Sequence, residues 1–161
     1  MAMEMIVLIG LQAAGKSTFC RQRFAGTHVL VSKDLLRNNR NPGRRQRRLI
    51  EDALRAGHSL VVDNTNATRE ERAELVGLGH EHGAMVTGYY FEPWAKGSLE
   101  RNSLREGKAR VPDVAIFATM KKLVRPSYEE GFDRLFRVRT AEGVRFDVSD
   151  WKEEEVCTDR L

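Results

Sequence analysis

The sequence predicts an α/β fold: a three-layer sandwich in which helices cover both faces of a mainly parallel sheet. Short apolar runs rich in Val, Ile, Leu and Tyr alternate along the chain with longer segments of helical periodicity. Clusters of turn-forming residues separate these segments. Polar or glycine-rich motifs directly follow three of the apolar runs, and the carboxyl ends of parallel strands share one edge of a sheet. We therefore expect these motifs to lie together.

The first quarter of the chain predicts two strands and two helical segments. Residues 5–9 are wholly apolar and predict a buried strand. A glycine-rich segment, 10–17, leads into a helix over 16–24. A second short strand is predicted at 28–31, and 34–39 resembles a helical turn.

The next elements are separated by clear turn signals. The Asn-Pro-Gly sequence places a loop at 39–43, and apolar residues recur at helical spacing over 44–55. Gly57 is suited to the position after the end of this helix. The apolar run 59–62 predicts a strand that ends at Asp63.

The second half of the chain continues the alternation of helices and strands. Thr68, with Glu71 three residues later, is a capping-box pattern at the start of a helix over 68–82. A strand follows at 84–91. The remaining expected elements are two helices and two short strands, at 94–106, 113–124, 136–138 and 144–148.

Composition limits the classes of protein to which the chain can belong. Its 161 residues fit one domain, 1–161, and a formal net charge of +4 weakly favours a polyanionic partner. Cys20 and Cys157 lie far apart with no CxxC motif, so the sequence indicates neither a disulfide framework nor a zinc site. No apolar stretch could span a membrane, and we find no secretory signal. We expect a cytoplasmic protein with no membrane partner and no obligate protein partner.

The segment 10–17 reads Gly-Leu-Gln-Ala-Ala-Gly-Lys-Ser and matches the phosphate-binding motif G-x-x-x-x-G-K-[ST]. In this motif, backbone N–H groups surround a phosphate chain, and glycines stand where a Cβ would block the loop. Lys16 is expected to reach the β and γ phosphates, and Ser17 to bind Mg²⁺. We therefore predict ATP and Mg²⁺ as cofactors of a P-loop NTPase-type fold. The predicted nucleotide contacts in this segment are Gly10, Gln12, Ala13, Ala14, Gly15, Lys16, Ser17 and Thr18.

A second motif follows the strand at 28–31. Asp34 could accept a proton from a substrate hydroxyl, and Arg37, three residues later, could hold a phosphate of the acceptor. The alternative is structural, with Ser32 or Asp34 capping a helix. Beside a phosphate-binding loop, we favour the catalytic interpretation.

Two further motifs are expected near the same phosphates. Asp63 ends its strand as a Walker-B aspartate does, where it would organise the water shell of Mg²⁺; the alternative is a side-chain-stabilised turn. Arg101 and Arg105 lie one helical turn apart, before the charged stretch 107–112. We interpret residues 101–112 as a mobile, arginine-bearing lid over the phosphates, against the alternative of a solvated helix face.

An arginine run extends from Arg37 to Arg48 without an acidic residue. It could follow a phosphodiester backbone, or it could reflect the general preference of this chain for arginine. The two interpretations of its helical part carry equal weight.

The four motifs together resemble the kinase domain of polynucleotide kinases, over roughly residues 5–140 and in the order of that family. The resemblance rests on the phosphate loop, the Asp34 and Arg37 pair, Asp63 and the Arg101 and Arg105 pair. It implies that Asp34 is the general base for a 5′-hydroxyl and that Arg37 engages the adjacent phosphate. Bifunctional members carry a phosphatase domain with an Asp-x-Asp motif, which is not found in these residues, so we expect a kinase alone.

The leading hypothesis is thus an ATP-dependent kinase that phosphorylates 5′-hydroxyl ends of DNA or RNA. Lys16, Mg²⁺ and the lid arginines would stabilise the transition state. A kinase for a small molecule or an aminoacylated tRNA is the first alternative. A nucleotide-dependent switch protein, which needs no acceptor base, is the second.

Overall fold

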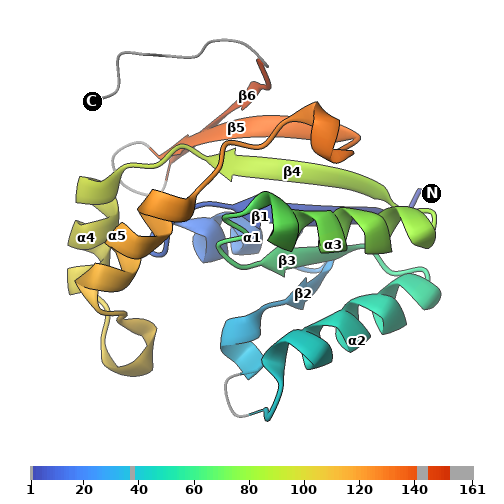
Figure 1. The fold of residues 1–161 in the computed structure, drawn as a ribbon, viewed down its shortest axis with the longest axis horizontal. Coiled ribbons are helices and arrows are strands. Elements are labelled where there is room, and N and C mark those ends of the chain that lie inside the picture. Colours follow the sequence, from blue (N-terminus) through green and yellow to red (C-terminus); the bar gives the residue numbers. More distant parts are fainter. Residues whose placement is uncertain (1, 37–38, 141–144, 153–161) are drawn as a thin grey trace.

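A computed structural model describes residues 2–36, 39–140 and 145–152 of the chain. Within them lies a six-stranded sheet of order β2-β3-β1-β4-β5-β6 (Figure 1). The first five strands pair in parallel, and β6 pairs antiparallel to β5. The predicted α/β fold with a mainly parallel sheet is confirmed. The strands are β1 (Glu4–Ile9), β2 (Val29–Val31), β3 (Leu60–Asp63), β4 (Met85–Phe91), β5 (Arg134–Thr140) and β6 (Phe146–Asp150).

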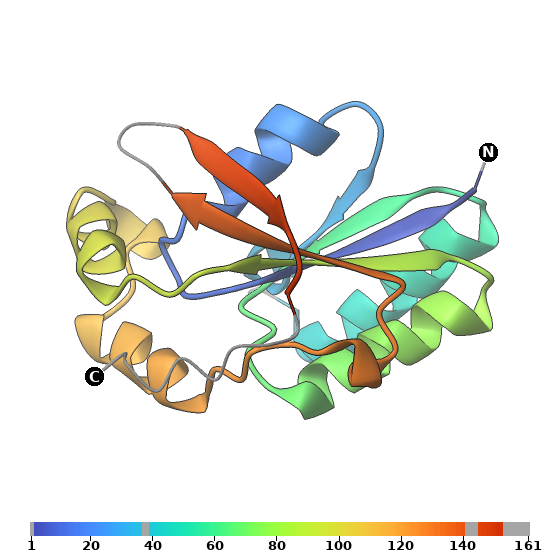
Figure 2. The same cartoon turned by 90° about the horizontal axis from the view of Figure 1, so that it is seen from above.

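Helices cover both faces of the sheet, so the three layers are also present. Helix α1 lies on one face, and α2 and α3 lie on the other (Figure 2). Helices α4 and α5 lie side by side beyond the carboxyl end of β4 (Figure 1). None of the described helices is long and apolar enough to cross a membrane. The helices are α1 (Lys16–Phe24), α2 (Pro42–Arg55), α3 (Arg69–Glu81), α4 (Ala95–Ser103) and α5 (Asp113–Lys122), with short 3₁₀ helices η1 (Lys33–Leu36), η2 (Gly107–Ala109) and η3 (Tyr128–Glu130).

The central strand β1 explains why the phosphate loop is held firmly. Its side chains alternate between two hydrophobic clusters. Ile6 and Leu8 pack with Phe19 of α1, whereas Met5 and Val7 belong to the cluster under α2 and α3. All four β1 side chains are fully buried. A strand buried on both faces is a rigid base for the loop that follows it.

Helix α2 begins two residues before the predicted start of the helix at 44. The last residues of the predicted loop 39–43 form its N-terminus. Asn41 is the N-cap, and its side-chain Oδ1 accepts a hydrogen bond of 3.1 Å from the Arg44 N–H. Pro42 occupies the first helical turn, where its missing N–H costs no hydrogen bond.

Helix α4 ends at Ser103, three residues before the predicted boundary. Its last turn tightens, since the N–H groups of Leu104 and Arg105 donate to carbonyls three residues earlier. Glu106 is then extended and Gly107 has a φ of +60°. Arg105 therefore lies beyond the helix, and the prediction that it shares one face of a continuous helix with Arg101 is wrong.

The predicted capping box of α3 forms only in part. Thr68 accepts a hydrogen bond of 3.2 Å from the Glu71 N–H, as expected. The Glu71 carboxylate, however, accepts from the N–H of Ala67 rather than from that of Thr68. The carboxylate thereby also stabilises the turn that connects β3 to α3.

Candidate active site

The phosphate loop connects β1 to α1 at the carboxyl edge of the sheet. Gly15 has a φ of +94°, a left-handed conformation that favours glycine. A Cβ at this position would lie 2.9 Å from Cε1 of Phe146 and 3.2 Å from Nη1 of Arg101. At the other end of the loop, a Cβ on Gly10 would lie 2.8 Å from Cβ of Phe91. Both glycines of the motif are therefore required by the packing around the loop.

Lys16 folds back across this loop. Its ammonium donates two hydrogen bonds of 2.8 Å, to the carbonyls of Gly10 and Leu11. Burial lowers the pKa of Lys16 to about 8; the Asp63 carboxylate opposes this shift and the Arg105 guanidinium adds to it. Near neutral pH, the charged groups around Lys16 therefore influence the fraction of its side chain that is protonated.

Ser17 and Asp63 meet although 46 residues separate them. The Ser17 hydroxyl donates a hydrogen bond of 2.8 Å to Oδ2 of Asp63, which is buried at the end of β3. Both are oxygen ligands of the kind that Mg²⁺ accepts, and Mg²⁺ commonly keeps several water ligands besides. In the described part of the chain, no cluster of three or more His, Cys, Asp or Glu side chains is placed to hold a metal.

The segment that carries Asp34 follows β2 as η1. The N–H of Asp34 donates a hydrogen bond of 3.2 Å to Oγ of Ser32, so Ser32 caps this turn. The Asp34 side chain is exposed and lines the cavity that Lys16 also lines. Arg37, its predicted partner, lies outside the described residues.

Asn64 ties this segment to the rest of the site. Its Oδ1 accepts a hydrogen bond of 2.9 Å from the Lys33 N–H, and its Nδ2 donates one of 2.6 Å to Oε1 of the buried Gln46 on α2. Asn66 donates a hydrogen bond of 2.7 Å to the Leu8 carbonyl. These asparagines connect β3, η1, α2 and β1.

The two predicted lid arginines take different positions. Arg101 lies against the phosphate loop at Gly15, in the last turn of α4. Arg105 lines the cavity, and its Nη1 donates a hydrogen bond of 3.3 Å to the Ala109 carbonyl. Both are thus beside the loop, although only Arg105 opens onto the cavity.

Two residues of this region, Asn102 and Gln12, make polar contacts that the sequence does not predict. The fully buried Asn102 donates to the Val111 carbonyl at 2.7 Å and accepts from the Val111 N–H at 3.0 Å. Gln12 of the loop donates a hydrogen bond of 2.9 Å to Oγ1 of Thr119 on α5. An asparagine between two arginines carries no sequence signal for such a role, because its partners are the backbone of Val111 and the carboxylate of Asp113, nine and eleven residues away.

A cavity of about 680 Å³ joins these parts. The phosphate loop, α1, η1, the end of β3 and the 105–111 segment all contribute to its wall. Its lining includes Gln12, Ala13, Ala14, Lys16, Ser17, Thr18, Lys33, Asp34, Asp63, Asn64, Arg105 and Lys122. Two of the predicted nucleotide contacts in the loop, Gly10 and Gly15, do not line the cavity, and they contribute to the shape of the loop instead.

Comparison with known proteins finds a family match and distant relatives. Residues 5–127 match the model of the AAA domain family. The chain is 28% identical over 139 residues, 81% of its length, to "Transcription factor bHLH140" of Arabidopsis thaliana. It is 25% identical over 139 residues, 84% of its length, to the bifunctional polynucleotide phosphatase/kinase of Schizosaccharomyces pombe. These stretches are 15% and 33% of the two relatives, so the chain spans at most a third of either.

A solved structure gives the same fold with a different named activity. The gluconokinase of Sinorhizobium meliloti 1021 superposes with a TM-score of 0.64 at 19% identity. The superposition covers 88% of this chain and 85% of the other. At this identity the likeness shows the fold alone.

Proposed function

This chain belongs to the AAA domain family, and from that premise we propose that it transfers the γ-phosphoryl group of ATP to the 5′-hydroxyl end of DNA or RNA. Its kinase-type P-loop domain supports a phosphotransferase. One observation carries the choice of a hydroxyl acceptor: the Asp34 carboxylate opens into the same cavity as Lys16 and Ser17. A switch protein that only binds ATP needs no base for an acceptor hydroxyl at this position. The polynucleotide acceptor is supported by the S. pombe relative.

The donor half of the site would hold the triphosphate. The segment from Gly10 to Thr18 would supply backbone N–H groups and the N-terminus of α1, both attractive to anions. The ammonium of Lys16 would leave its loop carbonyls for the β and γ phosphates. Arg101 and Arg105 would approach the same phosphates from the 101–112 segment.

The residues present fit Mg²⁺: the Ser17 hydroxyl and the Asp63 carboxylate lie 2.8 Å apart and would hold the ion directly or through its water ligands. When bound, Mg²⁺ would neutralise charge on the phosphates.

The acceptor half would work through Asp34. Its carboxylate accepts the proton of the attacking hydroxyl as that oxygen bonds to the γ phosphorus. The bond between the γ phosphorus and the bridging oxygen breaks, and ADP leaves with its electron pair. Arg37 is proposed to hold the phosphate next to the accepting nucleoside.

A small-molecule or aminoacyl-tRNA kinase is the alternative, because the gluconokinase shares this fold. An assay of 5′-hydroxyl oligonucleotides, nucleosides, gluconate and aminoacylated tRNA with γ-labelled ATP separates these possibilities. We expect label only on the oligonucleotides. Transfer to gluconate or a nucleoside at a higher kcat/KM would refute the polynucleotide acceptor, and turnover independent of every acceptor would indicate a switch protein.

The lowered pKa of Lys16 predicts a pH dependence of ATP binding. Phosphate anions stabilise the charged ammonium, so the pKa of Lys16 in the complex is higher than the value of about 8 in the free protein. The contribution of Lys16 to ATP affinity should therefore be complete well below pH 8 and decline as the pH rises through that value. Titration calorimetry in buffers of different ionisation enthalpy should detect proton uptake at pH 8.5. Lys16→Met is the control, and equal proton uptake by that variant would contradict the assignment to Lys16.

A further inference from the structure

The arginines of α2 and of the segment just before it fall into two groups. Arg47 pairs with Glu51 and Glu74, at 3.2 and 3.4 Å, and Arg55 lies 3.9 Å from Glu51. In contrast, no carboxylate among the described residues pairs with a second set of exposed arginines. This set, the arginine track, consists of Arg40, Arg44, Arg45 and Arg48.

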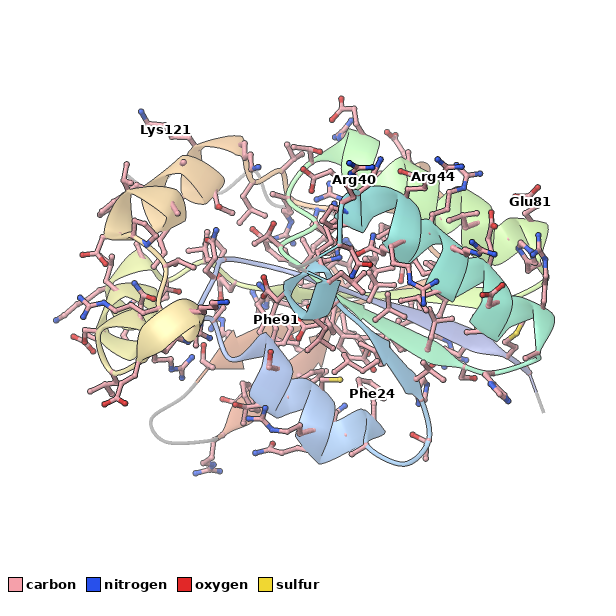
Figure 3. All side chains as sticks on the ribbon, turned by 90° about the horizontal axis from the view of Figure 1, so that it is seen from below. Phe24, Arg40, Arg44, Glu81, Phe91 and Lys121 are labelled. Carbon is pink, nitrogen blue, oxygen red and sulfur yellow. The ribbon has the colours of Figure 1, made fainter. Side chains whose placement is uncertain are left out.

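The arginine track begins next to the candidate active site. Arg40 lies between η1, which carries Asp34, and the N-terminus of α2. Figure 3 shows Arg40 and Arg44 extending outward from the start of α2. Arg44 and Arg48 are four residues apart, so they share one face of the helix at a spacing of about 6 Å. The track thus leads away from Asp34 along the outer side of α2.

Hydrogen bonds fix this helix relative to the acceptor segment. Gln46, in the middle of the track sequence, is buried and accepts the hydrogen bond of 2.6 Å from Asn64. The same Asn64 amide accepts from the Lys33 N–H, next to Asp34. Asn41 caps the helix immediately before Arg44. These hydrogen bonds hold the outer side of α2 in a fixed position relative to the segment that carries Asp34.

We propose that the arginine track binds the phosphodiester backbone of the nucleotides that follow the accepting 5′ end. This inference rests on the proposed function and goes beyond it by placing the contacts on α2. Guanidinium groups bind phosphates through charge-assisted hydrogen bonds. The helix has 14 residues and is about 21 Å long. A dinucleotide has a single phosphodiester, which the proposed function assigns to Arg37, so it would not engage the track, while an oligonucleotide of 12 residues would extend along it.

The test compares two double variants that remove the same charge from the same helix. Arg44→Ala/Arg48→Ala removes two track residues, and the matched control Arg47→Ala/Arg55→Ala removes two paired arginines. The dissociation constant of each for a fluorescent 5′-hydroxyl 12-mer is measured by anisotropy between 0.05 and 0.5 M salt. Thermal unfolding establishes that both variants are folded.

Each lost contact to a single strand should reduce the slope of log affinity against log salt by about 0.7, so two contacts account for about 1.4. If the variant and the unaltered protein bind equally at 1 M salt, this difference in slope makes the affinity of the variant roughly 25-fold weaker at 0.1 M salt. The control should retain the affinity and slope of the unaltered protein. An unchanged slope in Arg44→Ala/Arg48→Ala would overturn the proposal, as would equal competition by polyglutamate of the same length, which would indicate an acidic polypeptide as the partner.

Activity separates failure of the track from failure of the proposed function. The track variant should phosphorylate a 5′-hydroxyl dinucleotide at the normal kcat/KM and lose kcat/KM only with the 12-mer. If the unaltered protein phosphorylates both acceptors and the variant is normal with both, the track alone is wrong. If no acceptor is phosphorylated by the unaltered protein, the proposed function fails, and the anisotropy slopes still decide whether α2 binds nucleic acid.

Discussion

Replacing Asp34 with asparagine is expected to lower kcat for phosphoryl transfer by about 10²- to 10⁴-fold, the usual contribution of a general base. Asparagine keeps the size of the side chain but cannot take up the hydroxyl proton. ATP affinity should remain nearly unchanged, because the donor loop follows β1 whereas Asp34 belongs to η1 after β2. Single-turnover kinetics with the labelled donor measures the first quantity, and calorimetry the second.

The matched control for this experiment is Glu129→Gln, which makes the same carboxylate-to-amide change at an exposed position in η3. It should transfer phosphate at the normal rate. An Asp34→Asn variant with normal kcat would exclude proton transfer to this side chain. A variant that also loses ATP binding would mean that Asp34 supports the donor site instead.

The second large effect concerns stability and involves Arg72 of α3. This side chain is fully buried, and its guanidinium donates to both carboxylate oxygens of Glu130, at 2.8 and 3.1 Å. It also donates to three backbone carbonyls, those of Asn66, Ala67 and Val124. One arginine thus joins the end of the β3 turn to the segment after α5.

Arg72→Met should lower the free energy of unfolding by about 3–5 kcal/mol, because it leaves the Glu130 carboxylate buried without its partner. Urea denaturation at constant pH measures this change. The exposed Arg69→Met is the control, with an expected change within about 0.5 kcal/mol. Arg72→Met/Glu130→Leu should recover part of the loss, since the unpaired charge is gone while the carbonyls of Asn66 and Val124 still lack the Arg72 donor; the Ala67 carbonyl keeps the Val124 N–H. Equal stability of Arg72→Met and the unaltered protein would contradict the role of this pair.

The sequence predicts the parts of the site that follow from periodicity and local motif. The apolar runs predicted all six strands of the described sheet, and each strand end lies within two residues of its predicted position. Parallel pairing then predicted that the three motifs share one edge of the sheet. The hydrogen bond between Ser17 and Asp63 agrees with that inference, although it joins residues that no local pattern connects. Chain order and the handedness of crossover connections make such a meeting predictable.

The contacts that hold the site in place were not predictable, because they depend on where backbone groups lie after folding. Arg72 occurs in a helix rich in charged residues, and the residues around it resemble those around an exposed arginine. Asn102 and Gln12 likewise acquire their partners only in the tertiary structure. The early end of α4 was missed for a related reason: Leu104 to Glu106 have good helical propensity, and the turn at Gly107 overrides it.

The antiparallel pair of β5 and β6 bears on where the C-terminal boundary of this domain is placed. The family match stops at residue 127, before both strands, yet Phe146 of β6 packs behind Gly15 of the phosphate loop. A fragment cut at 127 would also leave the edge of β4 that faces β5 unpaired from Thr87 to Phe91, and exposed strand edges of this kind promote aggregation. The smallest useful expression fragment therefore extends through Asp150, well past the boundary that sequence similarity alone would give.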